Sequence, residues 1–193
     1  MTDDKVIVTM LSDLKHRVFP RPFERLGVTG RGLVGVEIGV HKGEHAESLL
    51  SYLDIKTLYL VDPYALYAEY EESRSHYGDD DSLDLAKAEA MGRLAPNAGK
   101  ISWVFKRSVD AATEIPDGID FVYVDGDHEE SSVRADIASF YPKVRSGGVI
   151  GGHDFYNGFT RQHDGVVRAV SQFAVRNDVT LQVELPDWWI QKP

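Results

Sequence analysis

The sequence predicts a single α/β domain in which a parallel sheet is covered by helices on both faces. Apolar, strand-like runs alternate along the chain with segments of helical periodicity, as they do in βαβ units. Strands that are buried on both faces consist mostly of Val, Ile and Leu, and LVGVEI is the first such run. A length of 193 residues suits one domain with a substantial core, and the sequence contains no internal repeat or linker that would divide residues 1–193.

Elements of the first half follow from apolar spacing and from chain breakers. Leu11, Leu14 and Val18 lie at helical spacing and predict a helix that ends before the prolines at 20 and 22. The stretch 65–81 is rich in Tyr and Glu and ends in the acidic run GDDD. It predicts an exposed insertion, which is either a substrate lid or a solvated connection. The other predicted elements are strands at 33–40 and 57–62 and helices at 46–53 and 83–94.

The second half continues this alternation. Apolar residues at helical spacing mark a crossover helix that ends before Pro142 and a later helix near the C-terminus. The residues concerned are Val133, Ile137, Phe140 and Tyr141 in the first helix and Val166, Val170, Phe173 and Ala174 in the second. Strands are predicted at 101–105, 119–124 and 148–151. Strands separated by helices in this way run parallel and need helices on both faces of the sheet.

Composition excludes several classes of protein. The chain contains 42% hydrophobic and 10% aromatic residues, which fits a folded globular enzyme. Zero cysteines exclude disulfides and thiolate chemistry, so a metal would be held by carboxylates, imidazoles, carbonyls or water. The net charge of −10 disfavours a nucleic acid partner, which needs a basic surface. Without a long apolar run or a signal-like start, we expect no membrane association and a cytoplasmic protein, which can be a homo-oligomer.

The segment VEIGVHKGE, residues 36–44, joins an apolar strand to a helix through a turn that contains Gly39 and Gly43. Glycines at such a turn let the backbone approach a nucleotide-type cofactor without an intervening Cβ. The fingerprint G-x-G-x-x-G is not met, because His41 stands in the place of the middle glycine. About 20 residues later Asp62 ends the next strand, where such folds place a carboxylate that accepts hydrogen bonds from ribose. Alternatively, Asp62 only begins an Asp-Pro turn.

Two later strands end in clustered ionisable residues. Asp125, Asp127 and His128 follow one strand, and His153 and Asp154 follow the next. Because the carboxyl ends of neighbouring parallel strands lie side by side, these groups should meet beside the glycine turn. They predict a divalent metal site with open positions for substrate oxygens, or an acid–base site. The alternative is that Asp125 and Asp154 cap the following helices or turns and the histidines only support them.

These motifs together resemble those of a known family. Glu37, Gly39 and Gly43 form an E-x-G-x-x-x-G pattern that is similar to the first motif of class I S-adenosylmethionine-dependent methyltransferases. VDGDHEES, PKVRSGGVI and a paired motif ending in Asp154 resemble the metal-dependent sugar O-methyltransferases of the macrocin O-methyltransferase type and their cephalosporin-hydroxylase-like relatives. The resemblance covers residues 36–155, and the closing DWWIQKP is similar to the broader group. It implies a Rossmann-like, doubly wound, mostly parallel seven-stranded sheet with a C-terminal antiparallel hairpin at 180–184 and 188–191.

The resemblance also implies which residues bind S-adenosylmethionine. Residues 1–30 would form a cap over this cofactor. Ser108 falls where the class contacts the adenine ring, although a role as a helix N-cap is an equal alternative. The cofactor-binding residues would be Glu37, Gly39, Gly43, Asp62, Ser108 and Asp125.

By the same resemblance, a divalent metal, Mg or Mn, would be held by Asp125, His153 and Asp154. His153 departs from the family, which has a carboxylate at this position, so the identity of the metal stays open. Asp127 corresponds to the general base of the family, and His128 is the other candidate for this role. Which of the two takes the proton is not fixed by the sequence.

The resemblance implies methylation of a hydroxyl group on a small molecule such as a sugar or a natural product. Two alternatives share the architecture, a nicotinamide-dependent oxidoreductase and a non-catalytic cofactor-binding protein. The oxidoreductase is disfavoured, because the middle glycine and a Tyr-x-x-x-Lys pair in a suitable helix are both missing from the sequence.

Overall fold

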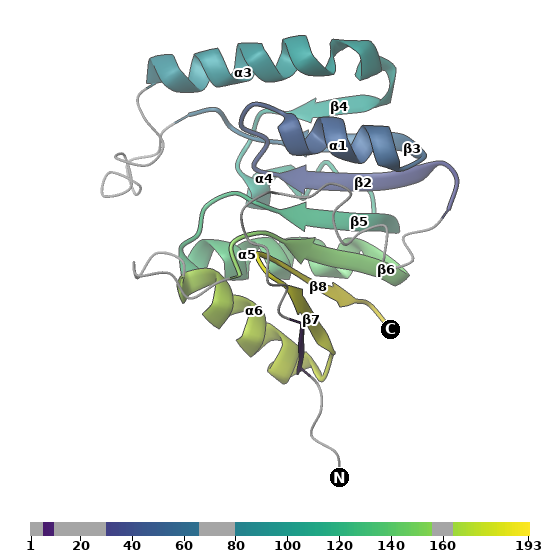
Figure 1. Ribbon diagram of the computed structural model, residues 1–193, viewed down its shortest axis with the longest axis vertical. Coiled ribbons are helices and arrows are strands. Elements are labelled where there is room, and N and C mark those ends of the chain that lie inside the picture. The colour runs from purple at the N-terminus through teal and green to yellow at the C-terminus, as the bar shows by residue number, and fades with distance from the viewer. Residues whose placement is uncertain (1–5, 10–29, 66–79, 156–163) are drawn as a thin grey trace.

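The computed structural model describes residues 6–9, 30–65, 80–155 and 164–193. Its centre is one eight-stranded sheet in the order β1-β7-β8-β6-β5-β2-β3-β4 (Figure 1). The strands β2 to β8 confirm the predicted seven-stranded sheet. The bounds are β1 (Val6–Thr9), β2 (Leu33–Ile38), β3 (Ile55–Val61), β4 (Ile101–Val104), β5 (Ile119–Val124), β6 (Val144–Gly152), β7 (Leu181–Glu184) and β8 (Asp187–Gln191).

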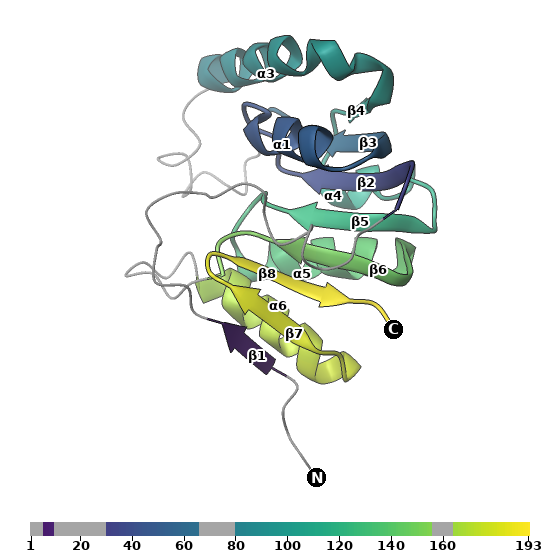
Figure 2. The ribbon, with the colours of Figure 1, turned by 45° about the vertical axis from the view of Figure 1, so that its right-hand side comes forward.

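The central strands are parallel. β2 pairs with β3 on one side and with β5 on the other, and β4 and β6 extend the sheet in the same direction. β8 runs antiparallel to both β6 and β7, as predicted for the C-terminal hairpin, and its arrow points the opposite way in Figure 2. After β2 the chain moves to one side of the sheet and later returns to the other side, next to β2. This change of direction between β2 and β5 is the place where doubly wound sheets bind ligands.

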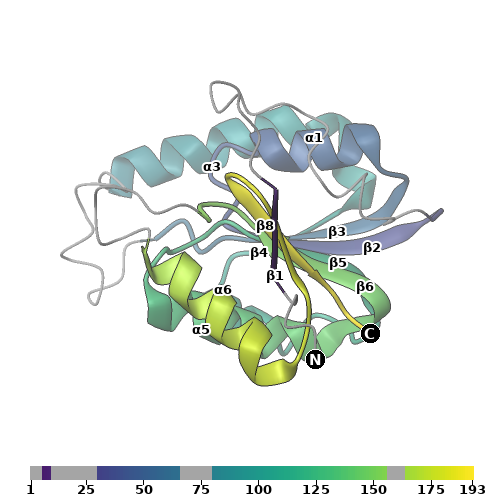
Figure 3. The same cartoon turned by 60° about the horizontal axis from the view of Figure 1, so that its bottom comes forward.

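Helices cover the sheet on both faces (Figure 3). α1 (Glu44–Tyr52) and α3 (Asp80–Leu94), with the short η3 (Ala95–Lys100), lie over one face. The other face is covered by α4 (Ser108–Ala111), α5 (Glu130–Phe140), η4 (Tyr141–Lys143) and α6 (Asp164–Asn177). The apolar positions that predicted these helices are buried against the sheet, among them Ala46, Leu49, Leu50, Val133, Ile137, Phe140, Val166, Val170 and Ala174.

The N-terminal prediction is wrong where the structure describes it. Instead of a helix through the first twenty residues, Val6–Thr9 forms β1, which pairs in parallel with β7 at the edge of the sheet. The reason is local, because VIVT consists of four β-branched residues, which lose side-chain freedom in a helix and favour an extended backbone. Leu11, Leu14 and Val18, on which the helix was based, lie outside the described residues, as does most of the predicted cap at 1–30.

The predicted insertion at 65–81 lies mostly outside the described residues. Its end is described, and there α3 begins at Asp80 within the acidic run, a few residues before the predicted helix at 83–94. Acidic residues favour the first turn of a helix, where they oppose the positive end of the helix dipole. Among the residues that the structure describes, no helix is long and apolar enough to cross a membrane.

Gly39 lies where the turn after β2 passes close to the end of β5. Its φ angle is +83°, and a Cβ atom at this position would lie 2.1 Å from the carbonyl oxygen of Asp125 and 2.7 Å from the Cα atom of Gly126. The amide of Asp125 also donates a 2.8 Å hydrogen bond to the carbonyl of Ile38. The glycine is therefore needed both for its backbone angle and for this contact between two backbones.

We expect Gly39→Ala to lower the free energy of unfolding by about 3 kcal/mol or more, since it combines overpacking against backbone with an unfavourable φ angle. Gly92→Ala on α3 is the matched control, because nothing lies within 4 Å of a Cβ there. A mid-helix Gly-to-Ala change should leave stability equal or raise it by up to about 1 kcal/mol. Urea unfolding of both variants makes the comparison. Equal stabilities would show that the two backbones are not in contact.

Candidate functional site

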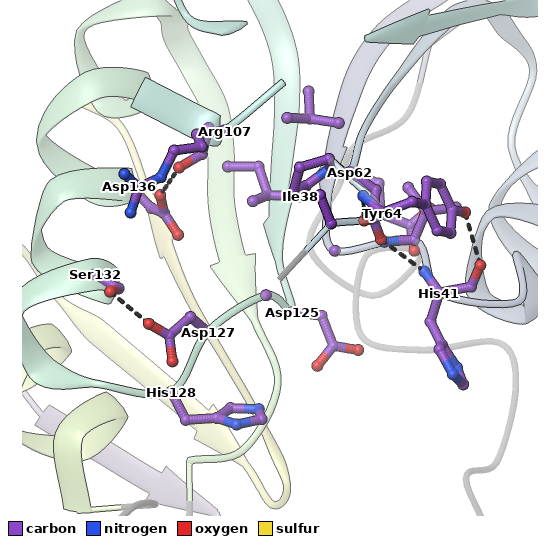
Figure 4. A pocket seen from close by; sticks show the side chains of 18 of the residues that line it. Ile38, His41, Asp62, Tyr64, Arg107, Asp125, Asp127, His128, Ser132 and Asp136 are labelled. Carbon is purple, nitrogen blue, oxygen red and sulfur yellow. Dashed lines mark hydrogen bonds between the residues drawn. The ribbon is translucent and has the colours of Figure 1, made fainter. Parts of the chain in front are cut away.

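A cavity of about 700 Å³ lies at the carboxyl ends of the central strands, over the change of direction between β2 and β5. Its volume is in the range of cofactor and small-molecule sites. In Figure 4, Asp127, His128 and Asp136 line one side, His41, Asp62 and Tyr64 line the other, and Asp125 lies between them. The lining residues are 37–42, 44, 45, 61–65, 83, 107–109, 125–128, 131, 132, 135, 136 and 154, so the predicted Gly43 is not among them.

Asp62 holds the glycine turn in place. One oxygen of its carboxylate accepts hydrogen bonds from the amides of Val40 (2.9 Å) and His41 (3.0 Å), and the other accepts one from the amide of Tyr64 (2.9 Å). The Asp-Pro turn that the sequence left open is therefore present, and it is joined to the turn after β2. The predicted contact of Asp62 with ribose remains a prediction. It would require the same carboxylate to accept hydrogen bonds from the ribose hydroxyls and from the backbone amides of the turn.

Tyr64 closes the same wall. Its hydroxyl group donates a 2.7 Å hydrogen bond to the carbonyl of His41, although the two residues are far apart in sequence. Burial, reinforced by the negative charges of Asp62 and Glu37, raises the pKa of the Tyr64 hydroxyl above its ordinary value. The phenol therefore stays neutral and remains a donor. It ties the loop after β3 to the glycine turn.

A buried polar pair forms another part of the lining. Glu37, which is 1% exposed, lies on β2, and its Oε1 is 3.0 Å from Nδ1 of His45 on α1. The His45 ring lies 3.9 Å from the ring of Tyr123, measured between centroids, and the Tyr123 hydroxyl donates a 2.8 Å hydrogen bond to Asp187. A carboxylate and an imidazole that are both buried and both on the cavity can bind the amino and carboxylate groups of a ligand.

The ionisable residues at the ends of β5 and β6 converge as predicted. Asp125, His128 and Asp154 each offer one ligand atom, and these three atoms lie within 4.8 Å of one another. Nε2 of His128 is 2.7 Å from Oδ2 of Asp154. Asp154 has a φ angle of 59°, a left-handed conformation that Asp tolerates better than most residues. Two carboxylates and one imidazole form a donor set that suits a divalent cation.

Protonation in this cluster is set by mutual charge. Burial alone would lower the pKa of His128, but its hydrogen bond to Asp154 and the charges of Asp154, Asp125 and Asp127 outweigh this effect and raise it. For Asp154, burial raises the pKa, but hydrogen bonds with His128 and His153 lower it well below its usual range. In the metal-free protein the pairing thus favours the imidazolium form of His128 and the carboxylate form of Asp154.

His153 lies beside the group of three rather than in it. It is 7% exposed, and its Nδ1 is 3.1 Å from Asp154 and 3.7 Å from Asp125. The sequence assigned the imidazole ligand to His153, whereas the geometry offers His128. A position next to both carboxylates suits a residue that orients them.

Asp127 has local partners. Its carboxylate accepts hydrogen bonds from the hydroxyl group of Ser132 (2.6 Å) and from the amide of Glu129 (3.2 Å), so it anchors the start of α5. The N-cap residue of α5 is Glu129, so Asp127 fixes the loop just before the helix. Asp127 also lines the cavity, so its predicted role as a base remains a prediction.

Ser108 lines the cavity at the start of α4, next to the N-cap residue Arg107. Its hydroxyl group donates a hydrogen bond to Asp136, a buried residue of α5. Burial raises the pKa of Asp136 to about 7, with a further rise from the charge of Asp127, while the hydrogen bond from Ser108 opposes the shift.

The sequence analysis did not identify His45, Tyr64 or Asp136. Helical spacing could have identified two of them, because His45 lies four residues before the buried Leu49, and Asp136 lies between Val133 and Phe140 on the buried face of α5. A charged residue on an apolar helix face needs a partner or a function. Tyr64 gave no such signal, because its contact to the glycine turn depends on the tertiary fold.

The fold and the cavity define a Rossmann-like methyltransferase. The chain belongs to a methyltransferase family, because residues 36–155, more than half of it, match a model described as a methyltransferase domain. The protein is therefore an S-adenosylmethionine-dependent methyltransferase. This assignment favours a methyl donor over the nicotinamide alternative. A search of curated proteins finds no match.

Solved structures share the fold at low identity. The O-methyltransferase NovP is 17% identical with a TM-score of 0.61, over 84% of this chain and 72% of that one. The O-methyltransferase TomG from Streptomyces achromogenes, involved in tomaymycin synthesis, is 17% identical with a TM-score of 0.57, over 84% and 74%. A putative methyltransferase from Streptococcus mutans, in complex with S-adenosylhomocysteine, is 14% identical with a TM-score of 0.60, over 90% and 97%. At these identities the likeness shows the fold alone.

We expect Asp62→Ala to lower the free energy of unfolding of the ligand-free protein by about 2 to 4 kcal/mol, because three backbone donors lose a charged acceptor. Asp54→Ala, at an exposed position before β3, is the control and should change stability by less than about 0.5 kcal/mol. Thermal and urea unfolding measure both. Unchanged stability combined with weaker cofactor binding would show that Asp62 serves the ribose and not the turn.

Proposed function

We propose that this methyltransferase transfers the methyl group of S-adenosylmethionine to a hydroxyl group of a small molecule such as a sugar or natural product, with assistance from a divalent metal. The observation that supports this most is the meeting of Asp125, His128 and Asp154 on the wall of the same cavity that the glycine turn lines. The net charge of −10 also supports a small acceptor over a nucleic acid.

The three side chains fit a metal with open positions. Two carboxylates and one imidazole leave room in an octahedral shell for water and for acceptor oxygens, as Mg²⁺ and Mn²⁺ require. Such an ion would lower the pKa of a bound hydroxyl and fix its direction. His153 lies against Asp125 and Asp154 and would hold both carboxylates in place. Glu37 and His45 offer a polar pair for the amino acid part of the methyl donor.

Asp127 is the proposed base when the metal is present. Methyl transfer forms an O–CH₃ bond and breaks the S–CH₃ bond, so the hydroxyl proton needs an acceptor. Since His128 would be a metal ligand, Asp127 is the neighbouring carboxylate left for this task. Ser132 and the amide of Glu129 hold it in one orientation, which suits a positioned base.

A metal-free version is the second candidate, and it is supported by the 2.7 Å contact between His128 and Asp154. Here His128 would take the proton and Asp154 would orient the ring and stabilise its charge. The raised pKa of His128 weakens this version, because it favours the protonated imidazole, which cannot accept a further proton. Chelation separates the two versions.

We expect activity to depend on a divalent cation. Purified protein is incubated with S-adenosylmethionine and a panel of nucleotide sugars, glycosides and catechols, with EDTA or with Mg²⁺ or Mn²⁺, and S-adenosylhomocysteine is quantified. EDTA should lower the rate by about a hundredfold or more and leave donor affinity nearly unchanged, because the ion orients the acceptor. Full turnover after thorough chelation would contradict the metal-assisted reaction and favour the pair of His128 and Asp154.

The identity of the imidazole ligand is tested by direct Mn²⁺ binding. His128→Gln should weaken binding more than His153→Gln, whose loss from an orienting position should cost about 10- to 100-fold. Asp84→Asn, exposed on α3, is the control and should leave binding unchanged. If His153→Gln weakened Mn²⁺ binding more than His128→Gln, His153 would be the imidazole ligand.

Asp127→Asn should bind metal and S-adenosylmethionine as the parent protein does, while turnover falls by about a hundredfold or more. Circular dichroism and unfolding check that α5 keeps its start, because an amide oxygen still accepts from Ser132. Turnover within about threefold of the parent protein would limit Asp127 to its structural role at the start of α5.

A further inference from the structure

One wall of the cavity contains a carboxyl group that the proposed reaction does not use. Asp136 is 4% exposed and comes from α5, and Ser108 reaches it from α4. Both residues line the cavity, together with Val109 and Ala135. Oδ1 of Asp136 accepts the Ser108 hydrogen bond, which leaves the second oxygen of the carboxyl group for another partner. In Figure 4 this carboxyl group lies on the cavity side of α5.

The chemistry of this wall matches the edge of a purine. A neutral carboxyl group can donate through its hydroxyl and accept through its carbonyl oxygen at the same time. Adenine presents a 6-amino donor beside a ring nitrogen that accepts, which is the complementary pattern. The nearby apolar side chain of Val109 and the Ser108 hydroxyl offer a surface for the flat ring and a further polar contact.

We propose that Asp136 recognises the adenine ring of the methyl donor, accepting from the 6-amino group and donating to the ring nitrogen beside it, N1 or N7. Ser108 positions the carboxyl group by donating to Oδ1. This inference deepens the proposed function and depends on it only for the identity of the donor. It assigns a specificity residue to α5.

Burial suits this role, because it favours the neutral acid. With a pKa of about 7, the carboxyl group of Asp136 loses its proton in the neutral range. The ionised form cannot donate, and it would place a negative charge against the lone pair of the ring nitrogen. The other charged groups of this wall are Arg107 at the start of α4 and Asp127 on the loop before α5. The Asp127 charge favours the neutral acid as well.

The test measures binding of S-adenosylhomocysteine by calorimetry from pH 6 to pH 8, on the full chain without metal. If only the protonated form of Asp136 binds well, the dissociation constant should rise about tenfold over this range, in proportion to the loss of the protonated fraction. Other ionisable side chains line the cavity, among them His41 and His45. The contribution of Asp136 is therefore read from the difference in pH dependence between the parent protein and an Asp136 variant.

Asp136→Asn is the decisive variant, because an amide donates and accepts like the neutral acid but does not titrate. It should bind as tightly as the parent at pH 6 and several-fold more tightly at pH 8. Asp136→Ala should bind more weakly at both pH values. Identical pH profiles of the parent and the Asn variant would overturn the proposal and leave Asp136 as a link between α4 and α5.

Deaza analogues of S-adenosylhomocysteine identify the ring edge. The difference between the parent and Asp136→Asn should disappear with the 1-deaza or with the 7-deaza analogue, whichever lacks the bound nitrogen. Its persistence with both would exclude contact with the ring edge. Failure of the proposed function looks different, since pH-dependent binding would then remain while no hydroxylated acceptor is methylated.

Discussion

The contact between the turn after β2 and the end of β5 determines the rest of the site. Gly39 lies so close to Asp125 that no Cβ fits, and the amide of Asp125 donates to the carbonyl of Ile38. This contact brings the glycine turn, which lines the methyl-donor cavity, next to the first residue of the acidic cluster. Asp62 and Tyr64 then hold the turn from the other side, through the amides of Val40 and His41 and the carbonyl of His41. The glycine turn and the acidic cluster are thereby held at one edge of the sheet.

Charge is divided between two ends of the cavity. At one end, the side chains of Asp125, Asp154 and His128 lie together, and two carboxylates with an imidazole that gives up its proton form a donor set for a cation. At the other end, burial raises the pKa of the Asp136 carboxyl group to about 7 and so favours its uncharged form, which suits an uncharged ring. The same residue type therefore serves opposite purposes, because exposure and neighbouring charges differ. In our proposal the purine would lie at α4 and α5, and methyl transfer would take place at the ends of β5 and β6.

Sequence periodicity predicted what is local and repeated. The strands, the crossover helices and the convergence of residues 125–128 with 153–154 follow from apolar patterns and from the rule for parallel sheets. β1 was not predicted, because the helical spacing of Leu11, Leu14 and Val18 was given more weight than the four β-branched residues of VIVT. The sequence placed His153 near the carboxylates, which the structure confirms, but it could not show that His128 also reaches Asp154, because that contact depends on the tertiary fold. Asp136 was overlooked although its place on the buried face of α5 was readable from the sequence.

Metal-assisted methyl transfer requires that the methyl donor and the metal lie next to each other at the β2–β5 change of direction. A crystal structure with S-adenosylhomocysteine and Mn²⁺, with anomalous data collected for both manganese and sulfur, measures this directly. We expect an anomalous manganese peak among Asp125, His128 and Asp154 and a thioether sulfur that faces it. The adenine ring should lie against Ser108 and Asp136. Manganese bound elsewhere, or a cofactor whose sulfur points away from the three metal-binding residues, would contradict this arrangement.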